Sequence, residues 1–422
     1  MKNVFASIIT IGDELLIGQV IDTNSAWMAQ ELNKIGIWVK RRIAVGDNWD
    51  EIWSALDQEQ EKAQVILITG GLGPTADDIT KPLLCEYFDG KMVVNEEAMQ
   101  NLKYIFETVL KRPMIERNLK QAETPDTCRV IPNRTGTAPG MWFEKNGRVF
   151  ISMPGVPHEM KGMMTAAVLP ALMKQLKLPS ILHRTLLTAG IGESYLADHI
   201  QSFENALPQH IKLAYLPNYG MVRLRLTATG DEKESLETEL EKEFELLKKS
   251  VAEWIVIDED LSMSQALGKL CKQRGLTLGT AESCTGGYIA HLLTLEPGAS
   301  LYFKGSIVSY ANEVKKDVLQ VDDRTLDAFG AVSEETVTQM ARGALNKLNT
   351  DLALATSGIM GPDGGTKEKP VGMVWVAVGN RQKIITQKFN FRFGRERNIE
   401  LTATNALNLL RKFIVSETRS GG

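Results

Sequence analysis

Ser283 has the sequence surroundings of a serine nucleophile. It lies in Ala281–Gly287, where an apolar strand candidate runs into a glycine-containing helix start. Such a start exposes unpaired backbone N–H groups and the positive end of the helix dipole, which would stabilise an oxyanion near Thr285 and Gly286. Gly287 would also let a ligand approach the backbone closely. On spacing alone, a helix cap is the more common role of such a serine.

A serine nucleophile needs a base, and Lys315 is the candidate that the sequence offers. It follows the next strand candidate, residues 307–310, which would bring it to the same edge of a parallel sheet as Ser283. Burial lowers the pKa of a lysine and can make it a base. Tyr310 could orient the serine or relay a proton. The alternative for Lys315 is a solvated lysine on a helix. Cys284, beside the serine, could also be the nucleophile, but it is equally well interpreted as a small, buried and unreactive thiol.

A second glycine-rich segment, residues 358–366, follows a later strand candidate. The backbone amides of Gly361, Gly364 and Gly365 could hold a phosphate. The carboxylate of Asp363 could bond a ribose hydroxyl. The segment lacks the Gly-Lys-Ser/Thr sequence of a Walker A loop, so it does not predict an ATP-type phosphate site.

Acidic residues follow strand candidates in the first part of the chain, beside another glycine-rich turn. The acids are Asp13, Glu14, Asp47, Asp77 and Asp78, and the turn contains Gly70, Gly71, Gly73 and Thr75. Carboxylates next to a turn that can cradle phosphates suggest a divalent metal acting on a pyrophosphate. Each acid could instead cap the helix that follows it.

Three regions of different pattern must position these residues. The first alternates strands (4–11, 38–45 and 65–68) with helices (from 23 to 35 and 50–63) and closes with residues 150–157 and a helix up to about 176, which predicts a doubly wound α/β sheet with ligands at the carboxyl ends of its strands. The second is a small α+β module with strands 184–189, 211–216, 221–229 and 254–257, helices 193–203 and 232–249, and a turn at 217–220. Residues 258–260 form an acidic linker. The third returns to α/β, with strands 276–280, 307–310, 351–356, 371–378 and 384–389 and helices 264–274, 312–319 and 396–413.

Composition narrows the class of protein. The 422 residues suggest two or three domains, and 43% hydrophobic with 24% charged residues is ordinary for globular protein. The net charge of −4 argues against a general nucleic-acid binder. The apolar runs are far shorter than the roughly 20 residues that span a membrane. The four cysteines form no C-x-x-C pair, so we expect no zinc site and reduced thiols in a cytoplasmic protein.

The motifs of the third region resemble the nicotinamide-nucleotide amidase domain of the CinA family. They are Thr280–Gly287, Tyr310–Lys315, Ser357–Gly365 and Lys369–Gly372. The resemblance implies hydrolysis of nicotinamide mononucleotide to nicotinate mononucleotide and ammonia, without a cofactor. It implies Ser283 as nucleophile, Lys315 as base and Tyr310 as supporting hydroxyl. The implied substrate-binding residues are Thr285, Gly286, Gly287, Asn312, Gly361, Asp363, Gly364, Gly365 and Arg395.

The sequence departs from the family pattern before its last helix. Family members often have Gly-Asp-Arg there, whereas this chain has Phe393-Gly394-Arg395-Glu396-Arg397. Arg395 fits the family arginine best and Arg397 is the alternative. Either guanidinium could pair with the substrate phosphate.

The first region resembles the CinA N-terminal domain, which is similar to the molybdopterin-binding fold. The motifs are Ile9–Leu16, Asp22–Asn24, Thr69–Thr75 with Asp77–Asp78, and Met153–Pro157. The resemblance implies hydrolysis of ADP-ribose or a related dinucleotide with Mg, Mn or Co. Asp78 and Glu14 match its acidic positions, and Asp13 and Asp47 complete the expected metal set. The middle module resembles the KH-like domain of the family but has no G-x-x-G loop, so RNA binding is not expected.

The sequence therefore predicts a three-domain α/β protein with a molybdopterin-binding-like domain (1–176), a KH-like α+β domain (177–258) and an amidase domain (259–422). The predicted function is a two-site nucleotide hydrolase of pyridine-nucleotide salvage. A homodimer is implied by the resemblance alone. Two alternatives stay open: a molybdopterin-binding protein, and a non-catalytic competence or DNA-damage adaptor.

Overall fold

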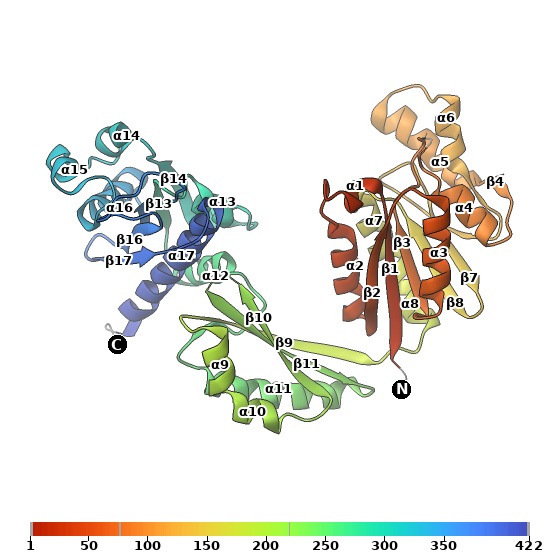
Figure 1. Ribbon diagram of the computed structural model, residues 1–422, viewed down its shortest axis with the longest axis horizontal. Helices are drawn as coiled ribbons and strands as arrows, with labels where there is room; N and C mark the ends of the chain where they lie inside the picture. The colour runs from red at the N-terminus through yellow and green to blue at the C-terminus, as the bar shows by residue number, and fades with distance from the viewer. Residues whose placement is uncertain (1–2, 76, 219, 420–422) are drawn as a thin grey trace. The chain divides into compact units, whose positions relative to one another are not determined.

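The computed structural model describes residues 3–75, 77–218 and 220–419. The chain forms two compact units, residues 1–182 with 228–239 and residues 183–227 with 240–422. Three main sheets organise it, one in each predicted region (Figure 1). No helix in these described ranges has both the length and the apolar character of a membrane span.

The N-terminal sheet has six strands in the order β2-β1-β3-β8-β7-β6. They are β1 (Val4–Ile11), β2 (Ile37–Val45), β3 (Val65–Thr69), β6 (Arg129–Ile131), β7 (Gly140–Lys145) and β8 (Arg148–Met153), and a separate ribbon pairs β4 (Met92–Val94) with β5 (Glu123–Pro125). The first four strands of the sheet run parallel, and β7 and β6 are antiparallel. The helices are α1 (Asp13–Leu16), α2 (Thr23–Lys34), α3 (Trp49–Gln60), α4 (Thr80–Tyr87), α5 (Glu96–Tyr104), η1 (Ile105–Leu110), α6 (Glu116–Leu119), η2 (Lys120–Ala122), α7 (Pro157–Met163), η3 (Met164–Val168) and α8 (Leu169–Gln175).

Both faces of this sheet are buried. Ile8 of β1 lies in a core with α2, α7 and α8, whereas Ile9 lies in a second core with α3 and α4. Figure 1 shows α2 and α3 on opposite sides of the central strands. Because side chains alternate between faces, a strand covered on both sides needs apolar residues at successive positions, as residues 4–11 mostly have; the two polar residues in this run, Ser7 and Thr10, are also buried.

The middle sheet has the order β10-β11-β9-β12. Its elements are β9 (Ser180–Ala189), α9 (Glu193–His199), α10 (Gln201–Ala206), β10 (Ile211–Asn218), β11 (Met221–Gly230), α11 (Lys233–Ser250) and β12 (Ile255–Ile257). The single helix expected at 193–203 is wrong, because the backbone leaves helical geometry at Ile200 (φ −104°, ψ 14°). Of the expected turn at 217–220, Pro217 and Asn218 belong to β10, and Tyr219 lies outside the described residues.

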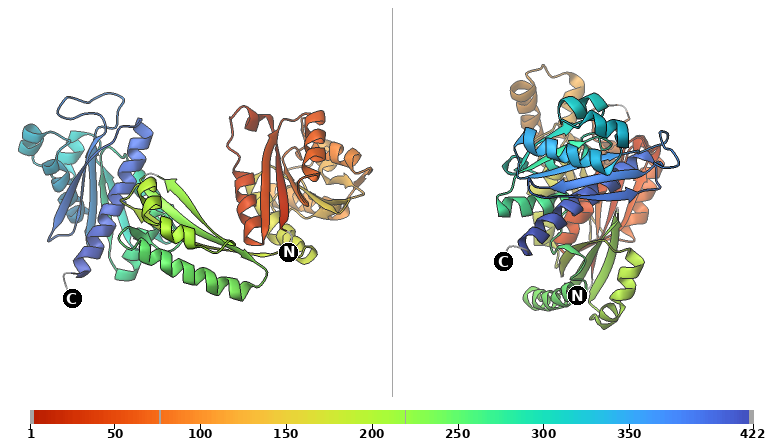
Figure 2. Two further views of the ribbon diagram at one scale, coloured as in Figure 1. Left: turned by 60° about the horizontal axis from the view of Figure 1, so that its bottom comes forward. Right: turned by 90° about the vertical axis from the view of Figure 1, so that its left-hand side faces the viewer.

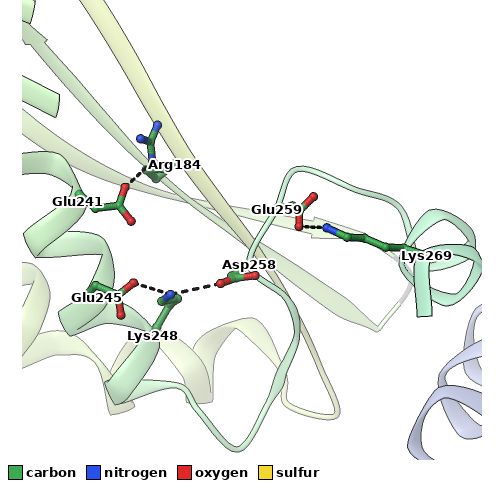
Figure 3. Close-up of polar contacts among 7 residues, drawn as sticks. All are labelled: Arg184, Glu241, Glu245, Lys248, Asp258, Glu259 and Lys269. Carbon is green, nitrogen blue, oxygen red and sulfur yellow. Dashed lines mark hydrogen bonds and ion pairs between the residues drawn. The ribbon is translucent and has the colours of Figure 1, made fainter. Parts of the chain in front are cut away.

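The acidic segment 258–260 follows β12, and each of its carboxylates has a cationic partner. Asp258 contacts Lys248 at 3.2 Å, Glu259 contacts Lys269, and Asp260 contacts Arg223 at 3.3 Å. Figure 3 shows the first two pairs together with the contacts Lys248–Glu245 and Arg184–Glu241. These groups are partly exposed, so each pair contributes little stability, about 0–1 kcal/mol.

The C-terminal sheet has the order β14-β13-β15-β16-β17, with β13, β14 and β15 parallel and the last two strands antiparallel (Figures 1 and 2). The strands are β13 (Leu278–Glu282), β14 (Phe303–Val308), β15 (Leu352–Gly358), β16 (Met373–Gly379) and β17 (Ile384–Asn390). The helices are α12 (Met263–Arg274), α13 (Tyr288–Thr294), η4 (Ala299–Leu301), α14 (Asn312–Asp317), α15 (Asp323–Phe329), α16 (Glu334–Leu348) and α17 (Arg395–Arg419). One face packs on α12, α13 and α17, and the other packs on α16.

Candidate functional site

Ser283 lies at the carboxyl end of β13, where the ends of three parallel strands meet. Its backbone N–H donates to the carbonyl of Thr356 in β15 at 3.0 Å. On the other side, the N–H of Ser309 donates to the carbonyl of Glu282 at 2.8 Å. Ser283 is 8% exposed. The expected position of the serine at a strand-to-helix junction is therefore the observed one.

Lys315 lies at the same edge of the sheet and is almost fully enclosed, with 1% of its surface exposed. Its Nζ donates to the carbonyl oxygens of Ser309 at 2.7 Å and Tyr310 at 3.2 Å. Burial lowers its pKa, and the nearby Cys284 and Glu313 oppose that shift. The surface-lysine alternative is wrong, because the side chain of Lys315 is inside the protein.

Cys284 is not a competing nucleophile. It is 5% exposed, and burial raises the pKa of its thiol to about 12. A thiol with that pKa carries almost no thiolate at neutral pH.

Tyr310 and Arg395 meet at the rim of this site. Arg395 donates to the Tyr310 hydroxyl at 2.9 Å and to the carbonyl of Gly361 at 2.8 Å. Tyr310 is 63% exposed, so its hydroxyl lies beside the arginine and not beside the buried amine of Lys315. Of the two candidate arginines, Arg395 is the one at the site, since the Arg397 guanidinium stacks on the Phe393 ring at 4.5 Å.

The backbone donors of the serine loop differ from the expected ones. The N–H of Gly286 already donates to the Ser283 carbonyl at 3.1 Å, and the N–H of Gly287 donates to Glu282 at 3.1 Å. Among the described residues, no acceptor is present for the N–H groups of Cys284 and Thr285. The N–H groups that this loop leaves available are therefore those of Cys284 and Thr285, whereas the N–H of Gly286, which was expected to be available, is already used.

Sequence reasoning missed the fully buried side chain of Glu282. Its carboxylate accepts from three hydroxyls and from three backbone N–H groups at the start of α13. The donors are the hydroxyls of Thr280, Thr285 and Ser306 and the amides of Gly287, Ile289 and Ala290, at 2.8–3.3 Å. The only sequence signal was an acid one residue before the serine, a position usually interpreted as exposed.

The second glycine-rich segment lies next to Arg395 and is largely exposed. Asp363, Gly364 and Gly365 are all exposed, and in the described ranges their N–H groups have no acceptor. Asn312 is exposed at the first turn of α14. These groups are available to a ligand, but the structure gives none of them a contact with Ser283.

A second pocket, of about 420 Å³, opens at the carboxyl ends of β1, β3 and β8. Its lining includes Gly12, Glu14, Asp47, Gly70, Gly71, Gly73, Asp77, Asp78, Gly155 and Glu159. Gly71 requires glycine, because its φ is +64° and a Cβ there would lie 2.1 Å from Thr80 Oγ1. The glycine turn and most of the predicted acids thus share one cavity.

Asp13 and Asp47 hold the two loops of this pocket together. The N–H of each residue donates to the carboxylate of the other at 3.2 Å. Burial raises the pKa of Asp47, and the negative charges of Asp13, Glu14 and Asp77 raise it further. The pocket therefore carries more negative charge than its own residues compensate, which favours a cation there.

The carboxylate of Asp78 holds the glycine turn in place by hydrogen bonds. It accepts from the N–H groups of Gly73 and Thr75 at 2.8 Å each and from the Thr75 hydroxyl. In the described part of the chain, no three His, Cys, Asp or Glu side chains converge as metal ligands. The expected acids line the pocket, but they are not gathered into a ligand cluster. Glu159, which sequence reasoning missed, also lines the pocket and accepts from Asn133 at 2.7 Å.

Known proteins match all three regions. Family models described as a probable molybdopterin binding domain, the damage-inducible protein CinA KH domain and the CinA C-terminal domain match residues 7–174, 183–256 and 260–414. A CinA-like protein of Cytophaga hutchinsonii is 45% identical over 97% of this chain and 98% of its own length. A CinA-like protein of Flavobacterium psychrophilum is 44% identical over the same shares. The crystal structure of competence/damage inducible protein CihA from Agrobacterium tumefaciens aligns over 36% of this chain and 94% of its own, at 38% identity and a TM-score of 0.34. The fold is a three-domain layout with a molybdopterin-binding-like domain, a KH-like domain and a CinA C-terminal domain, and the chain belongs to the CinA family.

Proposed function

We propose that the C-terminal domain hydrolyses the carboxamide of nicotinamide mononucleotide, with Ser283 as nucleophile and Lys315 as base. The observation that carries the proposal is the enclosed amine of Lys315, whose pKa is lowered by burial beside the serine loop. A structural lysine would be expected to pair with a carboxylate, whereas Nζ of Lys315 donates to two carbonyl oxygens.

The two carbonyl contacts orient the amine for proton transfer. A neutral amine has two N–H bonds and one lone pair. With both N–H bonds directed at the carbonyls of Ser309 and Tyr310, the lone pair takes a remaining tetrahedral direction. Lys315 then takes the hydroxyl proton of Ser283 as Oγ attacks the carboxamide carbon.

The intermediate is stabilised by backbone donors. The N–H groups of Cys284 and Thr285 hold the oxyanion. Collapse expels ammonia, which receives the proton from Lys315, and leaves an ester of Ser283. Water then hydrolyses the ester to release nicotinate mononucleotide. At the rim, Arg395 and the free amides of Asp363 to Gly365 supply donors for the phosphate.

Ser283→Ala tests the nucleophile. We expect loss of ammonia release from nicotinamide mononucleotide by roughly 10³-fold or more, because the covalent route is removed. Cys284→Ser is the matched control in the neighbouring position, and it should keep activity within about threefold, because the thiol is buried and protonated. Full deamidation by folded Ser283→Ala would refute the assignment.

A second function is favoured by the acidic pocket of the N-terminal domain. We propose metal-dependent hydrolysis of ADP-ribose or a related dinucleotide there. The support is the raised pKa of Asp47 among the charges of Asp13, Glu14 and Asp77, which a cation would relieve. Glu14, Asp47 and Asp77, which line the pocket, would hold it. A bound divalent metal would neutralise the pyrophosphate and lower the pKa of a water. Within the glycine turn, the N–H groups of Gly71 and Leu72 have no acceptor among the described residues and would position the phosphates.

AMP release from ADP-ribose, with and without Mg, Mn or Co, tests this second function. We expect activity only with metal, and a loss of roughly 10²-fold for Asp47→Asn with unchanged deamidation. Metal-independent cleavage would refute the metal site. Binding of a pterin without hydrolysis of either nucleotide would favour the molybdopterin-binding alternative, and inactivity at both sites would favour the adaptor alternative.

A further inference from the structure

The N–H groups at the start of α13 are already hydrogen-bonded to a carboxylate of the protein itself, that of Glu282. The Glu282 carboxylate accepts from the N–H groups of Gly287, Ile289 and Ala290 at 3.1, 3.0 and 2.9 Å. These are the unpaired donors at which a helix N-terminus would otherwise bind a phosphate or an oxyanion. The side chain is fully buried, so no ligand can replace it without moving the loop.

Three hydroxyls complete the set of donors around this carboxylate. Oε2 accepts from Thr285 at 2.8 Å, and Oε1 accepts from Ser306 at 3.2 Å and Thr280 at 3.3 Å. Six donors saturate the acceptor capacity of a carboxylate. A buried carboxylate held in this way is fixed in one position, and so are the groups bonded to it.

The serine loop is therefore tied at both of its ends. Glu282 lies immediately before Ser283, and its carboxylate holds amides five to eight residues further along the chain. Between these ends, the chain turns through left-handed geometry at Gly286 (φ +60°) and Gly287 (φ +96°). This turn leaves the N–H groups of Cys284 and Thr285 without a protein acceptor among the described residues.

We infer that Glu282 is the positioning residue of the amidase site. It neutralises the start of α13, holds the loop closed, and so reserves the N–H groups of Cys284 and Thr285 for the oxyanion. The inference rests on the proposed serine chemistry at Ser283. It also places the substrate phosphate away from the α13 N-terminus, because the donors there are already used.

Glu282→Gln tests the inference with nearly the same side-chain volume. The amide oxygen can keep the Gly287 and Ile289 bonds, and the NH2 group can donate to the hydroxyls of Ser306 and Thr280. The N–H of Ala290 then loses its acceptor and faces an NH2 group. We expect kcat to fall by roughly tenfold to hundredfold, since the oxyanion donors are displaced and not removed. KM should change by less than about twofold, and the pH profile should be unchanged because Lys315 is intact.

Two further variants separate positioning from folding. Glu59→Gln is the matched control, because Glu59 is another fully buried carboxylate and belongs to the other compact unit. It should leave deamidation unchanged even if it lowers the melting temperature. Glu282→Asp keeps the charge but shortens the reach by about 1.5 Å, and its kcat should lie between those of wild type and Glu282→Gln.

The outcomes that overturn the inference are specific. A folded Glu282→Gln with wild-type kcat overturns it, and so does a raised KM with unchanged kcat. If Glu282→Gln does not fold, wild-type kcat in Glu282→Asp overturns it. The labelling rate of Ser283 by a fluorophosphonate needs no natural substrate and should fall in Glu282→Gln. If wild type is labelled but does not deamidate nicotinamide mononucleotide, the proposed function fails while the positioning role is still decided by labelling.

Discussion

Lys315→Met removes the base and keeps the length of the side chain. General base catalysis contributes about 10²–10⁴ in rate, so we expect kcat to fall by that factor, which corresponds to about 3–5 kcal/mol of transition-state stabilisation. KM should change little, since Nζ is buried and contacts the carbonyls of Ser309 and Tyr310.

The same substitution has a calculable effect on stability. Met leaves two carbonyls without their donor, at a cost of about 1 kcal/mol each, and it removes a desolvated amine, which returns a similar amount. The free energy of unfolding at pH 7 should therefore change by less than about 2 kcal/mol. Burial lowers the pKa of Lys315 in the folded state, so the unfolded state binds more protons and wild-type stability rises with pH up to the ordinary lysine value of 10.5. Lys315→Met has no amine to titrate, so its stability should not show this rise with pH.

Ammonia release at saturating substrate between pH 6 and 10, with urea unfolding of the same samples, measures both effects. Wild-type kcat should rise with pH as the amine loses its proton and reach its plateau below pH 10.5, the ordinary lysine pKa. Lys315→Arg keeps a cation that does not deprotonate, and it should be as inactive as Lys315→Met. A folded Lys315→Met with more than about a tenth of wild-type kcat would refute the lysine base, because this exceeds the activity left by loss of any general base.

Two further predictions concern the N-terminal domain. Burial lowers the pKa of Lys81 to about 8, which costs about 3 kcal/mol of stability below that pH and progressively less as the pH rises towards 10.5. Lys81→Met also loses the bond to the Gln121 carbonyl, so in urea unfolding it should stabilise this domain by about 2 kcal/mol at pH 7 and by less at pH 9.5; equal stabilisation at both values would contradict the pKa shift. Asp78→Asn leaves one acceptor for the donors of Gly73 and Thr75, so it should cost about 1–2 kcal/mol and speed proteolysis of the glycine turn. Deamidation is the internal control, and an unchanged digestion pattern would show that Asp78 does not hold the turn.

The fold was predictable wherever strands are covered on both faces. The apolar run at 4–11 predicts a strand, and β1 has those bounds. Interruptions were harder to predict, because their cause lies in tertiary packing. No glycine or proline marks the break at Ile200 between α9 and α10, and the amphipathic pattern continues through it.

The candidate nucleophile and base of the amidase site were predictable from the sequence, but the hydrogen bonds that hold Glu282 beside them were not. The apolar pattern predicts that the strand ends at residue 280, whereas β13 continues to Glu282. Its continuation depends on the amide of Ser309, just after β14, and on amides from α13, which no local pattern reveals. The same reasoning applies to Asp78, whose acid type suggested a metal and whose contacts close a loop.

The two residues of the proposed dyad follow strands that differ in local stability. The nucleophile follows β13, which is paired on both sides, whereas the base follows β14, an edge strand with one row of unpaired backbone groups. Edge strands open locally at lower free energy than central strands. Amide hydrogens of β14 should therefore exchange with solvent faster than those of β13. On heating, the base would be displaced while the nucleophile and its loop are still in place, so deamidation should be lost several degrees before the domain unfolds.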